Sequence, residues 1–436
     1  MKQSSYSIAV LGLWHLGEIY SAGLAELGHH VCGVSDDKQV VSDFMKSAPP
    51  LPEPGLEALL LKNISAGRLS YTGDFKEIKN SNVIWITHDT PIDDNDNADT
   101  SVIFESLKKV LPYAQDGVLM VVTSQIPVGT SKEIKKYIRE RRPDLKYGYV
   151  YSPENLRLGD AVNCFLKPSR VVIGADAEED LKKAEEIFLG LNTEILKMST
   201  ASAEMSKHAL NAFLATSISF MGDIADICEK VGADVLDVTR ALRSDPRVGQ
   251  KAPLEAGLGF SGGTLARDLK ALYVTAKNHG IEAPVIESIL EKNFKRKDIV
   301  IRRLEEHLGT LKGKTITILG LTYKPGTRTL RRSVALEIEQ DMRRSGALLR
   351  LHDPQALPEE SAQYTNSVFY RDTKQAAAGA HALVLITPWP EFRTLEFEKL
   401  GARMKPPAVF FDTCNFLYAQ RDAILRSGFT YISVGR

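Results

Sequence analysis

The chain has 436 residues, of which 43% are hydrophobic and 25% are charged, so it is long enough for two or three domains with substantial cores. Its 55 basic residues balance its 55 acidic residues, which argues against nucleic acid or a membrane surface as partners. The four cysteines (Cys32, Cys164, Cys228 and Cys414) lack metal-ligand spacing. We expect a cytoplasmic protein with reduced cysteines and neither a signal peptide nor a membrane span.

The N-terminal segment has the order of a dinucleotide-binding βαβ unit. An apolar run at 6–11 predicts a strand, a helical pattern follows to Leu27, and VCGV at 31–34 predicts a second strand. Between the first strand and the helix lies the turn GLWHLG, formed by Gly12, Leu13, Trp14, His15, Leu16 and Gly17. Strand, glycine turn, helix and strand in this order predict a Rossmann-like fold.

The fingerprint of this turn departs from the usual one at two places. Trp14 occupies the second glycine position, where glycine normally lets the backbone approach the pyrophosphate. Ser35 stands where the ribose-binding acid is expected, with Asp36 one residue later. Because Asp36 and Asp37 would repel a 2′-phosphate, the sequence favours NAD, and NADP stays open as an alternative.

Further strands are predicted at 82–91, 117–131, 147–162 and 169–176. The first ends in Thr90-Pro91 and the second leads into a turn with Gln125, and such strand ends line the ligand crevice of a parallel sheet. The acidic stretch at 92–101 is interpreted as a solvated loop, because its spacing does not fit a calcium-binding EF-hand. Glu154 follows Ser-Pro at another strand end, and it is either a site carboxylate or the first acid of a helix.

A long helix is predicted at 201–231, with Gly222 as its single glycine and no proline. Thr200 or Ser202 is expected to cap it, and Glu204 to complement its N-terminus. Lys207 and Asn211 lie four residues apart and share one face. The lysine is expected to be half-buried, where it either stabilises an oxyanion together with the amide or extends its charged end to the surface of a packing helix.

After this helix the segment 247–268 is dense in glycine and has no regular period, which is typical of loops that bring backbone N–H groups to a phosphate. Helices are expected to follow to about Leu308. A second α/β unit then begins with a strand and the turn GLTYKPGT, and continues with strands at 349–354, 382–387 and 408–413. Its first turn carries the basic residues Lys324, Arg328, Arg331 and Arg332, which suit phosphates or a sugar acid.

These pieces together resemble the UDP-glucose/GDP-mannose dehydrogenase family nearly from end to end. The matching motifs are GLWHLG (12–17), Thr90-Pro91, SQIPVGT (124–130), YSPENLRLG (151–159), EMSKHALNAF (204–213), RVG with GLGFSGG (247–263), GLTYKPGT (320–327), HDP (352–354) and TPWPEF (387–392). The resemblance implies an α/β chain of two Rossmann-like doubly wound domains joined by a long central helix. It divides the chain into an NAD-binding domain (1–200), a central helical domain at a homodimer interface (201–297) and a nucleotide-sugar-binding domain (298–436).

The resemblance also implies roles for individual residues. Catalysis is implied for Lys207, Asn211, Asp268 and Glu154, with Thr264 at the nucleophile position. Cofactor contacts are implied for the turn 12–17 and for Ser35, Asp36, Thr90, Gln125 and Arg331. Contacts with a nucleotide-diphosphate sugar are implied for Glu154, Leu156, Lys207, Asn211, Arg247, Phe260, Gly262, Gly263 and Lys324, and Arg247 is expected to reach the ligand of a neighbouring subunit.

The departures from the family pattern change the expected reaction. Typical members form a thiohemiacetal and a thioester on a cysteine, and that position is Thr264 here. A threonine hydroxyl ionises poorly and is a poor leaving group. Further departures are Asp89, Gln125, Leu158, Arg267 and Cys414. We therefore expect a two-electron nucleotide-sugar dehydrogenase or a redox epimerase of specialised sugar pathways. The alternatives are a four-electron enzyme that makes a uronic acid and a non-catalytic nucleotide-sugar-binding paralogue.

Overall fold

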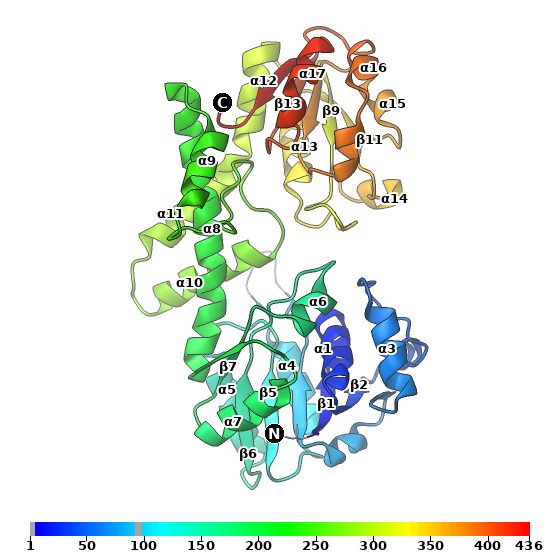
Figure 1. The fold of residues 1–436 in the computed structure, drawn as a ribbon, viewed down its shortest axis with the longest axis vertical. Helices are drawn as coiled ribbons and strands as arrows, with labels where there is room; N and C mark the ends of the chain where they lie inside the picture. The colour runs from blue at the N-terminus through cyan, green and yellow to red at the C-terminus, as the bar shows by residue number, and fades with distance from the viewer. Residues whose placement is uncertain (1–4, 92–97) are drawn as a thin grey trace. The chain divides into compact units, whose positions relative to one another are not determined.

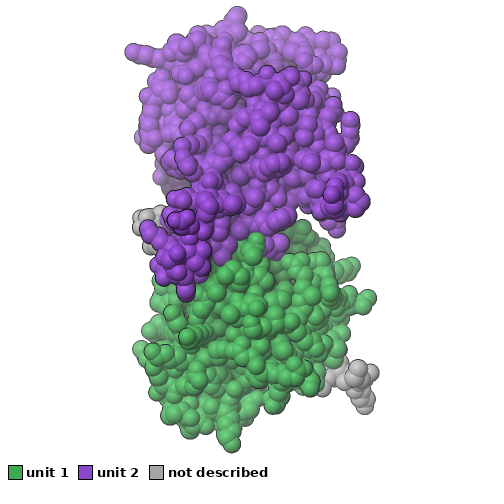
Figure 2. All heavy atoms as spheres, turned by 90° about the vertical axis from the view of Figure 1, so that its left-hand side faces the viewer, with its two compact units in different colours: residues 1–209 green, residues 210–436 purple. Residues whose placement is uncertain are grey.

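The structure is a computed structural model that describes residues 5–91 and 98–436. The chain divides into two compact units, 1–209 and 210–436 (Figures 1 and 2). One helix, α8 (Thr200–Val231), contributes to both units and is 32 residues long. Each unit is described separately below.

The N-terminal unit is built on a parallel sheet, as expected for a dinucleotide-binding fold. Within the described residues the sheet has eight strands in the order β3-β2-β1-β4-β5-β6-β7-β8, and only the β6–β7 pair is antiparallel. The order reverses between β1 and β4, which is where open α/β sheets bind ligands. The strands are β1 (Ser7–Leu11), β2 (His30–Val34), β3 (Leu69–Thr72), β4 (Val83–Ile86), β5 (Val118–Val122), β6 (Tyr147–Tyr151), β7 (Arg170–Gly174) and β8 (Glu194–Met198).

Both faces of this sheet are covered, so its inner strands are apolar throughout. On β1, Ile8 and Val10 enter one core cluster, whereas Ala9 and Leu11 enter the cluster on the opposite face. Trp85 of β4 is fully buried, and its indole N–H donates to the Thr123 hydroxyl at 2.8 Å. The covering helices are α1 (His15–Glu26), α2 (Lys38–Met45), α3 (Leu56–Ser65), α4 (Ser101–Val110), α5 (Thr130–Arg141), α6 (Ala161–Leu166) and α7 (Glu178–Phe188).

Helix α8 confirms the long central helix, and it runs through Gly222 without a break. The expected capping residues were wrong. Ser199 provides the cap, because its hydroxyl accepts the N–H of Ser202 at 3.2 Å. Glu204 accepts the N–H groups of Gly129 and Ser131, each at 2.7 Å, at the start of α5. Its carboxylate therefore caps α5 rather than its own helix, where a carboxylate would only complement the helix dipole.

The C-terminal unit contains helices that follow α8 and a second α/β part. The glycine-dense segment forms neither helix nor strand up to Gly263, as its composition predicts, but its last five residues, 264–268, begin helix α10. A small core of Ala215, Phe260, Leu269 and Ile289 joins α8, this segment, α10 and α11. The helices are α9 (Val235–Ser244), α10 (Thr264–Asn278), α11 (Pro284–Arg296), α12 (Asp298–Leu308), α13 (Val334–Arg344), α14 (Pro358–Ser361), α15 (Thr373–Ala377), α16 (Phe397–Gly401) and α17 (Arg421–Arg426).

The second sheet is parallel and has six strands, in the order β11-β10-β9-β12-β13-β14. Ile316 and Ile318 of β9 face one core cluster, and Leu319 faces the other. The order reverses between β9 and β12, which repeats the topology of the first sheet. The strands are β9 (Thr315–Leu319), β10 (Leu348–His352), β11 (Val368–Phe369), β12 (Ala382–Leu385), β13 (Val409–Asp412) and β14 (Thr430–Ser433).

Two parallel-sheet α/β domains joined by a long helix confirm the predicted fold class. Of the acidic stretch at 92–101, residues 92–97 lie outside the described part of the chain. None of the described helices combines the length and the apolar character needed to cross a bilayer.

Candidate functional site

The turn after β1 depends on its two glycines. Gly12 has φ of +90°, and a Cβ atom there would lie 2.6 Å from the backbone nitrogen of His88. A Cβ atom on Gly17 would lie 2.2 Å from the carbonyl oxygen of Gly12. The turn therefore packs directly against the end of β4 and the first turn of α1, which is the geometry that only glycine permits.

Trp14 does not require a glycine conformation. Its backbone is extended, with φ of −126° and ψ of −154°, and its side chain is 48% exposed. No side chain caps α1 at this residue. The first N–H groups of α1 therefore stay available to an anion. These features fit the pyrophosphate of NAD even though the second glycine is missing. Leu13 and Leu16 of the same turn are buried, whereas Trp14 is exposed.

Two buried carboxylates lie behind this turn. Glu53 Oε1 lies 2.9 Å from His15 Nε2, and the same carboxylate accepts the N–H groups of Gly159 and Ala161 at 2.8 and 3.2 Å. Glu18, in the first turn of α1, is fully buried. Burial raises the pKa of Glu18 to about 8, and the nearby Glu53 and Asp89 carboxylates act in the same direction. Glu18 is therefore protonated and uncharged at neutral pH. A negative charge on Glu18 would oppose the binding of a pyrophosphate at the neighbouring turn.

The ribose end of the predicted cofactor site lies after β2. Ser35 accepts the N–H of Asp37, and Asp37 caps α2 by accepting from Gln39 and Val40. Asp36 is exposed and forms an ion pair with Lys109 of α4, with 2.6 Å between Oδ2 and Nζ. The lysine lowers the pKa of Asp36. Both acids are exposed, but the Asp37 carboxylate is engaged in capping α2, which leaves Asp36 as the acid suited to accept ribose hydroxyls.

The ends of β4 and β5 also approach one another. The Thr90 hydroxyl donates to the carbonyl oxygen of Gln125 at 2.6 Å. His88, two residues before Thr90, packs beneath Gly12 and forms a hydrogen bond with Ser106 of α4. Burial lowers the pKa of His88 to about 4, so the imidazole is neutral. The predicted cofactor residues of this unit therefore follow the carboxyl ends of four neighbouring strands, β2, β1, β4 and β5.

Lys207 of α8 is buried, more deeply than the sequence predicts. Its ammonium donates to the carbonyl oxygen of Glu154 at 2.7 Å and to Glu154 Oε1 at 3.0 Å. The other oxygen, Oε2, accepts the N–H of Leu156 at 2.6 Å. The alternative that Glu154 begins a helix was wrong, since α6 starts only at Ala161. A buried ammonium paired with one carboxylate can still offer protons to a ligand oxygen.

Asn211, one turn further along α8, makes its own buried pair. Its amide N–H donates to Asp268 Oδ2 on α10. Asp268 is fully buried, and Arg267 Nε lies 4.0 Å from its other oxygen. Asn211 and Lys207 are thus held by different carboxylates on one helix, in agreement with the shared face that their spacing predicts.

The glycine-dense segment is tied to the turn after β9. The N–H of Gly262 donates to the carbonyl oxygen of Arg332 at 3.1 Å, and the Ser261 hydroxyl donates to that of Tyr323 at 3.1 Å. A Cβ atom on Gly262 would lie 3.0 Å from the Tyr323 ring. Arg332 has φ of +58°, which is uncommon for a residue other than glycine and is typical of functional sites. Phe260, Gly262 and Gly263 therefore lie beside the basic turn.

The HDP and TPWPEF motifs shape this basic turn. Asp353 is buried, and its Oδ2 accepts the N–H groups of Leu321 and Thr322 at 2.7 and 3.1 Å. The indole N–H of Trp389 donates to the same oxygen at 3.0 Å. A Cβ atom on Gly320 would lie 2.4 Å from the carbonyl oxygen of Thr387. The two motifs therefore hold the turn that carries Lys324.

The other predicted site residues are less constrained. Arg247 is exposed and paired with Asp245 at 2.6 Å. Arg331 is exposed, and Thr264 is the exposed first residue of α10. Their predicted contacts with a cofactor, a sugar or a neighbouring subunit stay predictions.

Sequence reasoning missed His88, Glu53, Lys109 and Asn293. His88 stands within the recognised strand end at Thr90 and could have been considered from the sequence. Lys109 could not, because it meets Asp36 across 73 positions of the chain. No motif marks Asn293, whose contacts with the glycine-dense segment are described below.

The fold and the glycine turn at the β1–β4 switch point define a dinucleotide-binding protein of the α/β class. The chain belongs to the UDP-glucose/GDP-mannose dehydrogenase family. It matches the family's NAD binding domain at 6–192, its central domain at 201–295 and its UDP binding domain at 317–419.

Relatives cover nearly the whole chain. It is 36% identical to UDP-glucose 6-dehydrogenase of Rhizobium meliloti, over 98% of this chain and 99% of that protein. It is 34% identical to UDP-glucose 6-dehydrogenase TuaD of Bacillus subtilis, over 98% and 93%. A UDP-glucose dehydrogenase from Pyrobaculum islandicum superposes with a TM-score of 0.88 at 28% identity, over 99% of this chain and 98% of that one. The protein is therefore an NAD-dependent oxidoreductase of this family, and its substrate is a nucleotide sugar.

Glu18 makes the stability of the protein depend on pH. Its pKa is raised from 4.5 to about 8, so between these values the folded chain keeps a proton that the unfolded chain releases. Stability falls as the pH rises through this range and then levels off. We expect Glu18→Gln to remove this fall and to raise the free energy of unfolding, relative to wild type, by on the order of a few kcal/mol at about pH 9 and by little at about pH 5.

Urea unfolding at several pH values measures this difference, with the exposed Glu57→Gln variant as a control that should show none. An equal gain at both ends of the pH range would contradict a titrating Glu18.

Asp36 and Lys109 should set the choice between NAD and NADP. We expect Asp36→Asn to shift the ratio of dissociation constants towards NADP by about tenfold, because the carboxylate no longer repels a 2′-phosphate and Lys109 is released to bind it. The double variant Asp36→Asn/Lys109→Gln should lose most of the gain. Fluorescence titration with both cofactors measures the ratio, and an unchanged ratio in both variants would place Asp36 away from the ribose.

Proposed function

We propose that the protein oxidises one hydroxyl group of a UDP-sugar to a carbonyl, with transfer of one hydride per sugar, or epimerises the sugar by returning that hydride. The observation that carries the proposal is the pairing of Lys207 with the half-buried Glu154 and of Asn211 with the buried Asp268, where position 264 holds a threonine and not a cysteine. Lys207, Asn211 and Asp268 are the polar groups that alcohol oxidation needs. A thioester cannot form, because no cysteine stands at position 264.

The roles follow from the hydrogen bonds that these groups make. Lys207 and Asn211 donate to the developing alkoxide, and Asp268 takes the hydroxyl proton through a water molecule. The C–H bond breaks with both electrons leaving as hydride, for which bound NAD is the acceptor. Glu154 compensates the charge of Lys207 and orients its ammonium.

Thr264 lacks the assistance that a hydroxyl nucleophile needs. Among the described residues its hydroxyl has no hydrogen-bonding partner, and it lies at the exposed start of α10. A serine-type or threonine-type nucleophile requires an adjacent base. The proposal therefore gives Thr264 no covalent role.

The names of the relatives favour a second candidate. Proteins 31–36% identical to this chain are UDP-glucose 6-dehydrogenases, which favours a four-electron oxidation to a uronic acid with water as the nucleophile. A third candidate, a non-catalytic sugar-binding paralogue, has Trp14 as its main support.

Three further assignments belong to the proposal. The NAD-binding, central and sugar-binding parts are taken as 1–200, 201–297 and 298–436, and Lys324, Arg331 and Arg247 as contacts to substrate, cofactor and a neighbouring subunit's ligand. The four cysteines are all free, which supports a reducing, cytoplasmic location.

A homodimer through α8 is also proposed. Phe213, Phe220 and Ile227 recur every seven residues along α8, and their side chains are 66%, 49% and 56% exposed. An apolar stripe at this spacing on a monomer is typical of a helix–helix interface.

The electron count is measured by the yield of NADH per sugar, with UDP-, GDP- and TDP-sugars run to completion. We expect one NADH for each UDP-sugar consumed and a carbonyl product that hydroxylamine traps. No net NADH with an isomerised sugar would assign the epimerase form of the proposal. Two NADH per sugar would overturn it in favour of the uronic acid.

Thr264→Ala is the matched variant for this experiment, and it should keep its turnover within about twofold, because the hydroxyl forms no bond to the sugar. A loss of about a hundredfold or more would give Thr264 a covalent or proton-transfer role. If NAD binds only to Trp14→Gly, the native protein is the non-catalytic paralogue.

The dimer is tested by replacing the stripe on α8. We expect Phe213→Asp/Phe220→Asp to halve the mass measured by sedimentation equilibrium, because two buried charges would oppose the interface. Leu61→Asp changes an equally exposed residue on α3 and should leave the mass unchanged. A dimeric double variant would place the interface elsewhere.

A further inference from the structure

Asn293 of α11 holds the backbone of the glycine-dense segment by both ends of its amide. Its Oδ1 accepts the N–H of Phe260 at 2.8 Å, and its Nδ2 donates to the carbonyl oxygen of Phe260 at 3.1 Å. The approach is close, because a Cβ atom on Gly259 would lie 2.3 Å from Asn293 Oδ1. The side-chain amide therefore replaces the partner strand that this segment lacks.

Arg296, three residues later on the same helix, makes a second attachment. Its Nε donates to the carbonyl oxygen of Gly257 at 2.8 Å, and Nη1 pairs with Asp226 of α8. The residue is 5% exposed, so this guanidinium is buried in the protein. Arginine is suited to this position because its planar group reaches two acceptors in fixed directions.

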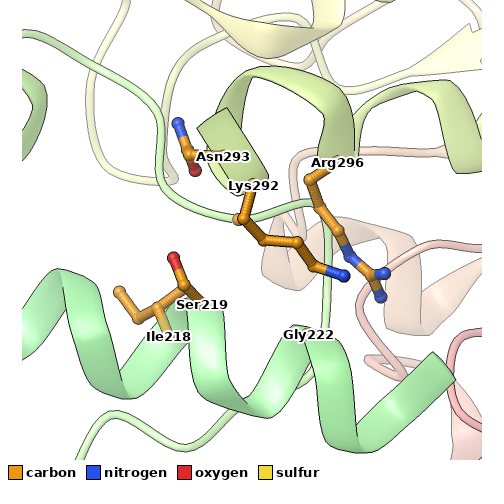
Figure 3. A pocket seen from close by; sticks show the side chains of 7 residues that line it. Ile218, Ser219, Gly222, Lys292, Asn293 and Arg296 are labelled. Atoms are coloured by element: carbon orange, nitrogen blue, oxygen red, sulfur yellow. The ribbon is translucent and has the colours of Figure 1, made fainter. Parts of the chain in front are cut away.

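Helix α8 fixes α11 in turn. Figure 3 shows Lys292 and Arg296 extending from α11 towards α8 around Gly222. Lys292 pairs with Asp223 at 2.6 Å and with Asp226 at 2.9 Å. The pocket between these side chains measures about 10 Å³, which is the space of about one water molecule and too small for an organic ligand. The cluster is an attachment and not a binding site.

We propose that Asn293 and Arg296 are positioning residues that fix the backbone of residues 257–263 for binding the nucleotide sugar. The inference rests on the proposed function, which gives this segment its ligand. The core already holds the Phe260 ring, but packing does not fix the direction of an N–H or a carbonyl group at glycine positions. The side chains of Asn293 and Arg296 fix those directions. Arg296 is itself paired with Asp226 of α8, the helix that also carries Asn211.

The test compares three variants by steady-state kinetics with a UDP-sugar and by NAD titration. Asn293→Leu removes both hydrogen bonds with little change of volume, and Asn293→Asp keeps only the acceptor for the Phe260 N–H. We expect KM for the UDP-sugar to rise by about tenfold or more in Asn293→Leu and by less in Asn293→Asp, because backbone groups are misplaced. Asn278→Leu, at an exposed site on α10, should match wild type.

The dissociation constant of NAD should stay within about twofold in all three variants, because Asn293 belongs to the other unit from the cofactor turn. If Asn293→Leu does not fold, Asn293→Asp and Asn293→Gln provide the comparison. The inference would be overturned if folded Asn293 variants had the wild-type KM for the UDP-sugar. It would also be overturned if they lost NAD binding and sugar binding to the same extent. A wild-type protein that binds no nucleotide sugar would instead overturn the proposed function.

Discussion

The burial of polar groups on one face of α8 constrains the rest of the structure. Glu204, Lys207, His208 and Asn211 lie within two turns and are all buried. Each needs a partner, because an unpaired polar group away from water is costly. The partners come from the start of α5, from Glu154, from the carbonyl oxygen of Ile126 and from Asp268. The motifs SQIPVGT and YSPENLRLG therefore supply hydrogen-bonding partners for Glu204, Lys207 and His208 of α8.

The turns after β1 and β9 each contain a glycine that packs against the backbone at the end of the neighbouring strand. Gly12 presses against the backbone of His88, and Gly320 against that of Thr387, at the end of the neighbouring strand in each case. Both glycines have positive φ. Around the second turn, Asp353 and Trp389 add hydrogen bonds. In the first unit the half-buried His88 packs against Gly12 and is neutral, because burial lowers the pKa of its imidazole to about 4.

Much of the fold could be predicted, because apolar runs mark the buried strands. The helix at 201–231 could be predicted because the segment has helix-forming residues, a single glycine and no proline. The strands β3, β8, β11 and β14 were missed, since each lies at an edge of its sheet and all four are short and partly exposed, so burial leaves little pattern in them. Lys207 and Asn211 followed from their spacing. Their partners did not, because Glu154 and Asp268 lie 53 and 57 residues away in the chain.

The continuity of α8 has a consequence for protein engineering. An α-helix advances by about 100° per residue, and 32 residues span about 48 Å. A single residue inserted between Lys207 and Asn211 would rotate the later part of α8 by about 100° relative to Glu204 and Lys207, which keep their own partners. Chimeras that exchange sugar-binding parts between relatives should therefore be joined beyond Val231, where the helical register no longer has to be preserved.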